Sequence, residues 1–96
     1  MQLFVFIRFH AFEGREDAVA TAIREVIVAS RAEAGCVAIE AFRATRNSRL
    51  FYIHSRWIDE AAFDDHAGFP HTVQFLAKMR LLVDHPVEVV RTTPLG

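Results

Sequence analysis

The sequence has no hydrophobic run long enough to cross a bilayer, and this absence sets a first limit on function. The apolar run near its start, Leu3 to Ile7, is far shorter than the ~20 residues that a membrane helix needs. Gln2 precedes this run in place of a basic segment, and Arg8 ends it, so no secretion signal is expected. A membrane is therefore not a predicted partner.

The sequence also has no large excess of positive or negative charge, and it has little cysteine. The chain has 11 Lys and Arg residues against 12 Asp and Glu residues, mixed along its length, for a net charge of −1. Without a basic block to follow a phosphate backbone, nucleic acid is not an expected partner. Cys36 is the only cysteine, which excludes an internal disulfide and fits a reducing compartment. The predicted location is the cytoplasm.

Apolar residues, in contrast, are abundant. Hydrophobic residues make up 52% of the chain, and nine residues are Phe. The length fits one domain over residues 1–96, and a domain this small leaves much apolar surface uncovered. A homodimer would bury that surface, although a dense monomeric core is the alternative.

Hydrophobic periodicity and capping residues predict seven elements. Strands are expected at 3–10, 37–44, 50–58 and 87–91, and helices from the Gly14 turn to about Glu33, at 60–66 and at 70–83. Asp59 should cap the second helix, Pro70 should begin the third, and Gly35 should end the first. The expected buried stripes are Val19, Ala22, Ile23, Val26, Ile27 and Ser30 in the first helix, and Val73, Leu76, Met79, Leu82 and Val83 in the third.

The order β-α-β-β-α-α-β predicts an α+β, ferredoxin-like fold. This split β-α-β arrangement has an antiparallel sheet with its helices on one face. The run Leu3 to Ile7 is apolar at every position, which indicates that both faces of its strand are covered in the assembled protein. Dimerisation of two sheets into a closed barrel would cover the second face.

Two histidines near a tight helix-to-helix link are the strongest candidates for chemistry. His66 ends one short helix, His71 lies in the first turn of the next, and the Gly68-Phe69-Pro70 link should bring them together. A helix N-terminus favours neutral His71, which could polarise an oxygen, whereas His66 could act as a general base. We expect both to face one cavity. Alternatively, both are structural residues hydrogen-bonded to backbone carbonyls.

Motifs for cofactors are absent. The chain contains no Gly-rich phosphate loop, dinucleotide fingerprint or serine elbow. The spacing of His54, His66 and His71 matches no metal-binding motif. We therefore expect no flavin, haem or metal, and a redox enzyme built from this chain would work without them.

The chain resembles the antibiotic biosynthesis monooxygenase family, of dimeric α/β-barrel fold. The residues that carry the resemblance are Gly14, the run Ser30 to Cys36, Phe51-Tyr52 entering a strand that ends at Trp57, Ala62-Phe63, and His66 followed by Phe69-Pro70-His71. The resemblance implies oxidation of a small phenol, anthrone or quinol with molecular oxygen, without a cofactor. His66 and His71 are the implied catalytic residues, and Trp57, Phe63 and Phe75 the implied substrate-binding residues.

The sequence departs from the family pattern in two places, and other functions remain open. Ser55 stands where many relatives have Glu, and residues 72–83 contain no His that could ligate haem. A carbonyl isomerase would have a more basic pocket, and a non-catalytic dimeric binder of a hydrophobic molecule would have a wholly apolar one. Because one fold hosts several chemistries, the choice rests on the site.

Overall fold

The computed structural model describes residues 1–96 as four strands and three helices. The strands are β1 (Leu3–His10), β2 (Cys36–Arg43), β3 (Leu50–Trp57) and β4 (Glu88–Thr92), and the helices are α1 (Glu16–Arg31), α2 (Glu60–Gly68) and α3 (Pro70–Leu82). The predicted elements are thus all present, with ends that differ by a few residues. No helix combines the length and apolarity needed to span a membrane.

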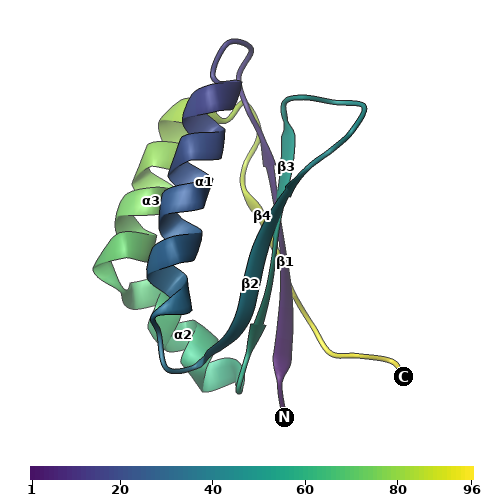
Figure 1. The fold of residues 1–96 in the computed structure, drawn as a ribbon, viewed down its shortest axis with the longest axis vertical. Coiled ribbons are helices and arrows are strands. Elements are labelled where there is room, and N and C mark those ends of the chain that lie inside the picture. Colours follow the sequence, from purple (N-terminus) through teal and green to yellow (C-terminus); the bar gives the residue numbers. More distant parts are fainter.

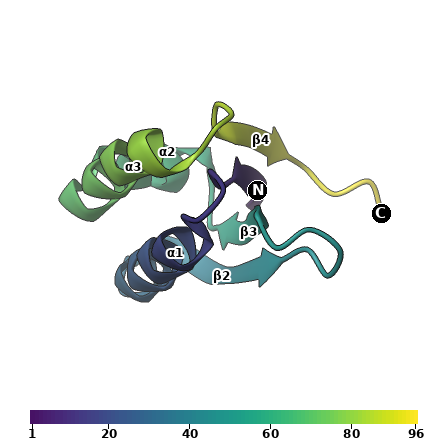
Figure 2. The same ribbon diagram turned by 90° about the horizontal axis from the view of Figure 1, so that it is seen from above.

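The strands form one antiparallel sheet in the order β2-β3-β1-β4. The helices α1 and α3 lie side by side against one face of this sheet, with α2 at one end (Figure 1). No helix covers the other face (Figure 2). This arrangement confirms the ferredoxin-like α+β fold that the order of elements predicted.

Capping residues set the helix ends largely as expected. The Asp59 side chain accepts a 2.8 Å hydrogen bond from the backbone N–H of Ala62, and Pro70 begins α3. The first helix, however, ends at Arg31 rather than near Glu33, so Glu33 lies in the turn before β2. The backbone of this turn is fixed by hydrogen bonds from Glu33 N–H to Ser30 and from Cys36 N–H to Glu33.

Gly35 has a different role from the helix stop that the sequence suggested. It lies four residues beyond α1, where α2 packs closely on the turn. A Cβ atom at position 35 would come within 2.5 Å of the Ala62 Cβ. Glycine is therefore required there by the close approach of α2.

The core lies between the sheet and the helices in two parts. The larger part joins the sheet to α1 and α3, and it includes Phe9, Val19, Ile23, Phe75 and Met79. The smaller part lies at the α2 end of the sheet and consists of Leu3, Val5, Trp57 and Phe63. The apolar residues at alternate positions of β1 and β3 contribute to these clusters, as expected for strands with one face against helices.

The predicted stripe of α3 is partly wrong. The helix buries Thr72, Phe75 and Met79, while Val73 and Leu76 are exposed. Apolar residues occupy a wide arc of this helix, so hydrophobic periodicity alone is consistent with two neighbouring faces as the buried one. The stripe of α1 is confirmed except for Ile27, which is partly buried, and Ala20 is buried in addition.

The sheet face without helices is rich in aromatic side chains. Phe6, Phe42, Tyr52 and Val90 are all exposed on it. The Nε atom of Arg56, also on this face, is buried and has no hydrogen-bond partner within the single chain. This surface is therefore apolar and contains a buried hydrogen-bond donor that has no partner within the chain.

At its far end, β1 is tied to the segment between α3 and β4. The Nδ1 atom of His10 lies 2.6 Å from Oδ1 of Asp84. This hydrogen bond is the main reason that the pKa of Asp84 falls to about 2.

Candidate functional site

A cavity of about 240 Å³ lies between the sheet and the helices. Its wall is mostly apolar, with side chains from all four strands and all three helices. Leu76 and Val89 line it and are also exposed, so the cavity opens between α3 and β4. The polar side chains that line it are Ser30, Ser55, His66, Thr72 and Arg91.

His66 is the one titratable imidazole on the wall of this cavity. Its side chain is only 9% exposed, and its Nδ1 atom lies 2.7 Å from Oε2 of Glu33. The Thr72 hydroxyl lies 3.4 Å from the same nitrogen, at the limit of a hydrogen bond. Because a carboxylate can only accept, the nitrogen that faces Glu33 carries its hydrogen. This contact fixes the orientation of the ring and its tautomer.

His71 reaches the same carboxylate from the other side. Its Nε2 atom also lies 2.7 Å from Oε2 of Glu33, and the two imidazole centroids are 6.0 Å apart. The expectation that the Gly68-Phe69-Pro70 link brings both histidines together is confirmed. Glu33, which is 7% exposed, accepts from both.

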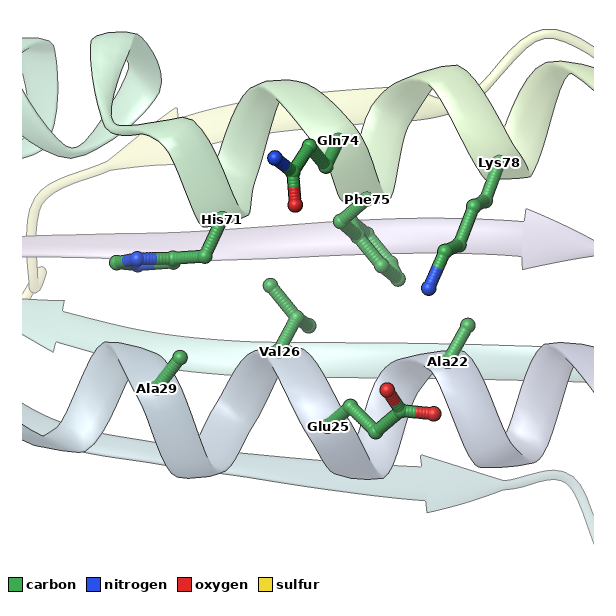
Figure 3. Close-up of a pocket in the computed structure, with 8 residues that line it drawn as sticks. All are labelled: Ala22, Glu25, Val26, Ala29, His71, Gln74, Phe75 and Lys78. Atoms are coloured by element: carbon green, nitrogen blue, oxygen red, sulfur yellow. The ribbon is translucent and has the colours of Figure 1, made fainter.

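The two histidines nevertheless line different hollows, so the expectation of one shared cavity is wrong. His71 lies in an outer groove of about 220 Å³ between α1 and α3. Figure 3 shows that His71, Gln74, Phe75 and Lys78 project from α3 toward Ala22, Glu25, Val26 and Ala29 of α1. The side chains of Val26 and Phe75 line both hollows and so form the wall between them.

Trp57 supports His66 from behind. The indole is fully buried, its ring centroid lies 4.4 Å from that of His66, and its Nε1–H donates to the Ser55 hydroxyl over 3.0 Å. It is absent from the wall of the cavity, where we expected it. The indole therefore holds the imidazole in place, and Ser55 takes up its only donor.

The other two predicted substrate-binding residues do line the cavity. Phe63 and Phe75 are both buried on its wall. Arg91 of β4 lies over the Phe63 ring at 4.9 Å and pairs with Glu60 and Asp64 of α2 at 3.0 and 2.7 Å. These hydrogen bonds, led by that to Asp64, raise the pKa of Arg91.

Sequence reasoning did not identify Glu33 as a site residue. The helix expected from the Gly14 turn to about Glu33 places this residue at a helix end. Its position in the run Ser30 to Cys36 was the only available signal. The early end of α1 instead turns the carboxylate toward the histidines.

Comparison with known proteins agrees with this architecture. The model of the antibiotic biosynthesis monooxygenase family matches residues 2–78. YcnE of Bacillus subtilis, named as a proposed monooxygenase, is 34% identical over 80 residues, which cover 83% of each chain. Rv0793 of Mycobacterium tuberculosis, named likewise, is 28% identical over 91 residues, which cover 95% of this chain and 89% of that protein.

Solved structures share the whole fold. The structure of Rv0793 superposes with a TM-score of 0.94 at 25% identity, covering 100% of this chain and 97% of that one. The structure of PA3566 from Pseudomonas aeruginosa superposes with a TM-score of 0.91 at 27% identity, covering 99% of this chain and 95% of that one. With the family model matching most of the sequence, the chain belongs to the antibiotic biosynthesis monooxygenase family.

Proposed function

We propose that this protein is a cofactor-independent monooxygenase that oxidises a small quinol, phenol or anthrone with molecular oxygen. One observation carries the proposal: an imidazole held by a buried carboxylate lines a mostly apolar cavity. Membership of the family supports the reaction class. Such a reaction requires a base to deprotonate the substrate and a cavity that excludes water.

In this proposal His66 is the general base. With the hydrogen of the ring on Nδ1, facing Glu33, the lone pair lies on Nε2. Nε2 can accept a proton from a substrate in the cavity, while Glu33 stabilises the imidazolium that forms. The pairing follows the logic of other catalytic histidines that a carboxylate orients.

The deprotonated substrate supplies the electrons for oxygen. For an anthrone-type carbon bearing two hydrogens, loss of one proton gives an anion that transfers one electron to O₂. The resulting radical and superoxide combine, and a proton completes a carbon-bound hydroperoxide. Removal of the second proton then breaks the O–O bond, leaving a carbonyl and water. The balance is substrate plus O₂ to ketone plus water, with no external reductant.

We assign His71 a positioning role. It lies in the outer groove with 30% of its side chain exposed, and its contact with Glu33 fixes the carboxylate that holds His66. The expectation that neutral His71 polarises an oxygen of the substrate does not fit this location.

The cavity itself favours this function over the two alternatives. Its volume of about 240 Å³ is below the ~300–1,000 Å³ typical of sites for larger ligands, so it suits a small molecule. A phosphorylated carbonyl compound would need a free cation, and Arg91 is already paired with two carboxylates. A passive apolar binder would not need His66 on the wall.

We also propose that the protein acts as a homodimer. The sheet face without helices carries exposed Phe6, Phe42 and Tyr52, and the unpartnered Nε of Arg56. A second sheet packed on this face would bury the aromatic side chains and offer an acceptor to Arg56. An obligate interface of this kind buries about 2,000 Å² or more.

Oxygen uptake by the purified protein tests the proposed activity. The protein, in EDTA and without added flavin or nicotinamide, is mixed with a panel of quinols, phenols and anthrones in an oxygen electrode. We expect uptake with at least one substrate and one O₂ consumed per ketone or quinone formed. Isomerisation of a carbonyl compound without oxygen uptake would support the isomerase, and binding without turnover the binder.

A further inference from the structure

A second group of metal-binding side chains lies at the far end of β1, outside the cavity. The Nδ1 atoms of His10 and His85 lie 2.6 and 2.7 Å from Oδ1 of Asp84. The two imidazole centroids are 4.9 Å apart. Two imidazoles and one carboxylate therefore converge, with their donor atoms all within 4.8 Å of one another.

The backbone holds these residues together independently of their side chains. The N–H of Asp84 donates to the carbonyl of His10 over 3.0 Å, and the next residues pair as an isolated bridge between Ala11 and Val83. The N–H of Phe12 then donates to Leu82 over 2.9 Å. The donors are thus positioned by three successive contacts between distant segments, which lowers the cost of organising a metal site.

In contrast to the expectation from the sequence that the chain binds no metal, we infer that His10, Asp84 and His85 form a binding site for a divalent transition metal of the zinc class. Imidazole nitrogen and carboxylate oxygen are ligands that Zn²⁺ takes in proteins, and three such ligands with one water complete a tetrahedron. The His85 side chain is 61% exposed, so the cation and its water can reach the site. The side chains of His10 and Asp84 are 12% and 22% exposed, which fixes the other two ligands more firmly.

Binding of the cation replaces the hydrogen bonds now present. Each Nδ1 would lose to solvent the hydrogen that it now donates to Asp84 and give its lone pair to the metal, with the ring hydrogen then on Nε2. Ligands at 2.0–2.1 Å from a tetrahedral ion are about 3.3 Å apart, so each Nδ1 must move roughly 0.6 Å farther from Oδ1 of Asp84. Rotation of the exposed His85 and a small movement of Asp84 supply this change.

The buried group around Glu33 has the same ligand types but a different setting. There His66 is packed against Trp57, at 4.4 Å between ring centroids, and the carboxylate is almost wholly buried. A metal ion would find less access for a water ligand at that position. The group at the end of β1 lines neither the inner cavity nor the outer groove, so the inferred site joins β1 to the α3–β4 segment and takes no part in the proposed oxidation.

Zinc titration of the full chain, freed of any purification tag and stripped with chelator, tests the inference. Calorimetry should show one Zn²⁺ per chain, and Co²⁺ should give the visible absorption of a tetrahedral site. His10→Ala, Asp84→Asn and His85→Ala should each weaken binding at least about tenfold. Zn²⁺ should also raise the Tm of the parent protein by about 5 °C or more, and this rise should be lost in His85→Ala.

His66→Ala distinguishes the two groups of ligands. We expect this variant to bind Zn²⁺ as tightly as the parent protein. Because His85 is exposed, His85→Ala should fold normally, and circular dichroism checks this. Absence of stoichiometric binding, or binding that His66→Ala abolishes and His85→Ala leaves unchanged, would overturn the inference.

Discussion

Nδ1 of His66 lies 2.7 Å from Oε2 of Glu33, although the two residues are 33 positions apart in the sequence. The contact joins the turn after α1 to the end of α2, and His71 at the start of α3 donates to the same oxygen. Three segments therefore meet at one buried carboxylate. The orientation of the imidazole that lines the cavity depends on this meeting point.

Removal of the Glu33 carboxylate should impair turnover more than binding. Glu33→Ala is expected to lower kcat by about tenfold or more with little change in KM, because Glu33 orients His66 but does not line the cavity. Glu33→Asp should recover part of the loss. Glu25→Gln, an exposed carboxylate of α1, is the matched control. A rise in KM with unchanged kcat would show that Glu33 binds substrate instead.

A methyl group at position 35 should destabilise the fold. Gly35→Ala places a Cβ within 2.5 Å of Ala62, so α2 must move, and we expect a loss of about 1–3 kcal/mol in the free energy of unfolding. Gly68→Ala is the control, since nothing lies within 4 Å of its Cβ. Urea unfolding of both variants measures the difference. Equal stabilities would contradict the close approach of α2.

The bare sheet face should mediate dimerisation. Light scattering at micromolar concentration is expected to give a dimer, and Phe6→Asp should give a monomer because the charge would be buried against the partner. Val28→Asp changes an apolar residue that is 65% exposed on α1 and should leave the dimer intact. A monomeric parent protein would disprove the proposed assembly.

Cys36 should react slowly with alkylating reagents near neutral pH. Burial, and secondarily the nearby charge of Glu33, raise the pKa of the thiol above its reference value of 9.0. The reactive thiolate is therefore scarcer at pH 7 to 8 than in a free cysteine. The rate of iodoacetamide modification should rise with pH to a midpoint above 9.0. A midpoint at or below that value would be contrary to this environment.

Much of the fold follows from local patterns. The stripe of α1, the Asp59 cap and Pro70 at the start of α3 each depend on neighbouring residues, and the order of elements then limits the sheet to few topologies. The buried face of α3 was harder to predict from the sequence, because Val73 and Leu76 fit the spacing of a buried helix stripe as well as Thr72 and Phe75 do. Only packing against α1 and the sheet decides between them.

The candidate site and the inferred metal site were harder to predict, because both are formed by contacts between residues that are distant in the sequence. The link between α2 and α3 predicted that His66 and His71 would be close, and they are. Nothing local indicated that Glu33 would lie between them, or that Phe75 and Val26 would separate the inner cavity from the outer groove. The group of His10 and Asp84 spans 74 positions and has no sequence signature.

Oxygen uptake with His66→Ala tests the central claim most directly. With a substrate that the parent protein oxidises, we predict a fall in rate of about a hundredfold or more, because the general base is lost. Asp65→Ala, an exposed neighbour on α2, should keep the parental rate. Circular dichroism establishes that both variants are folded. A folded His66→Ala variant that consumes oxygen at the parental rate would contradict the account.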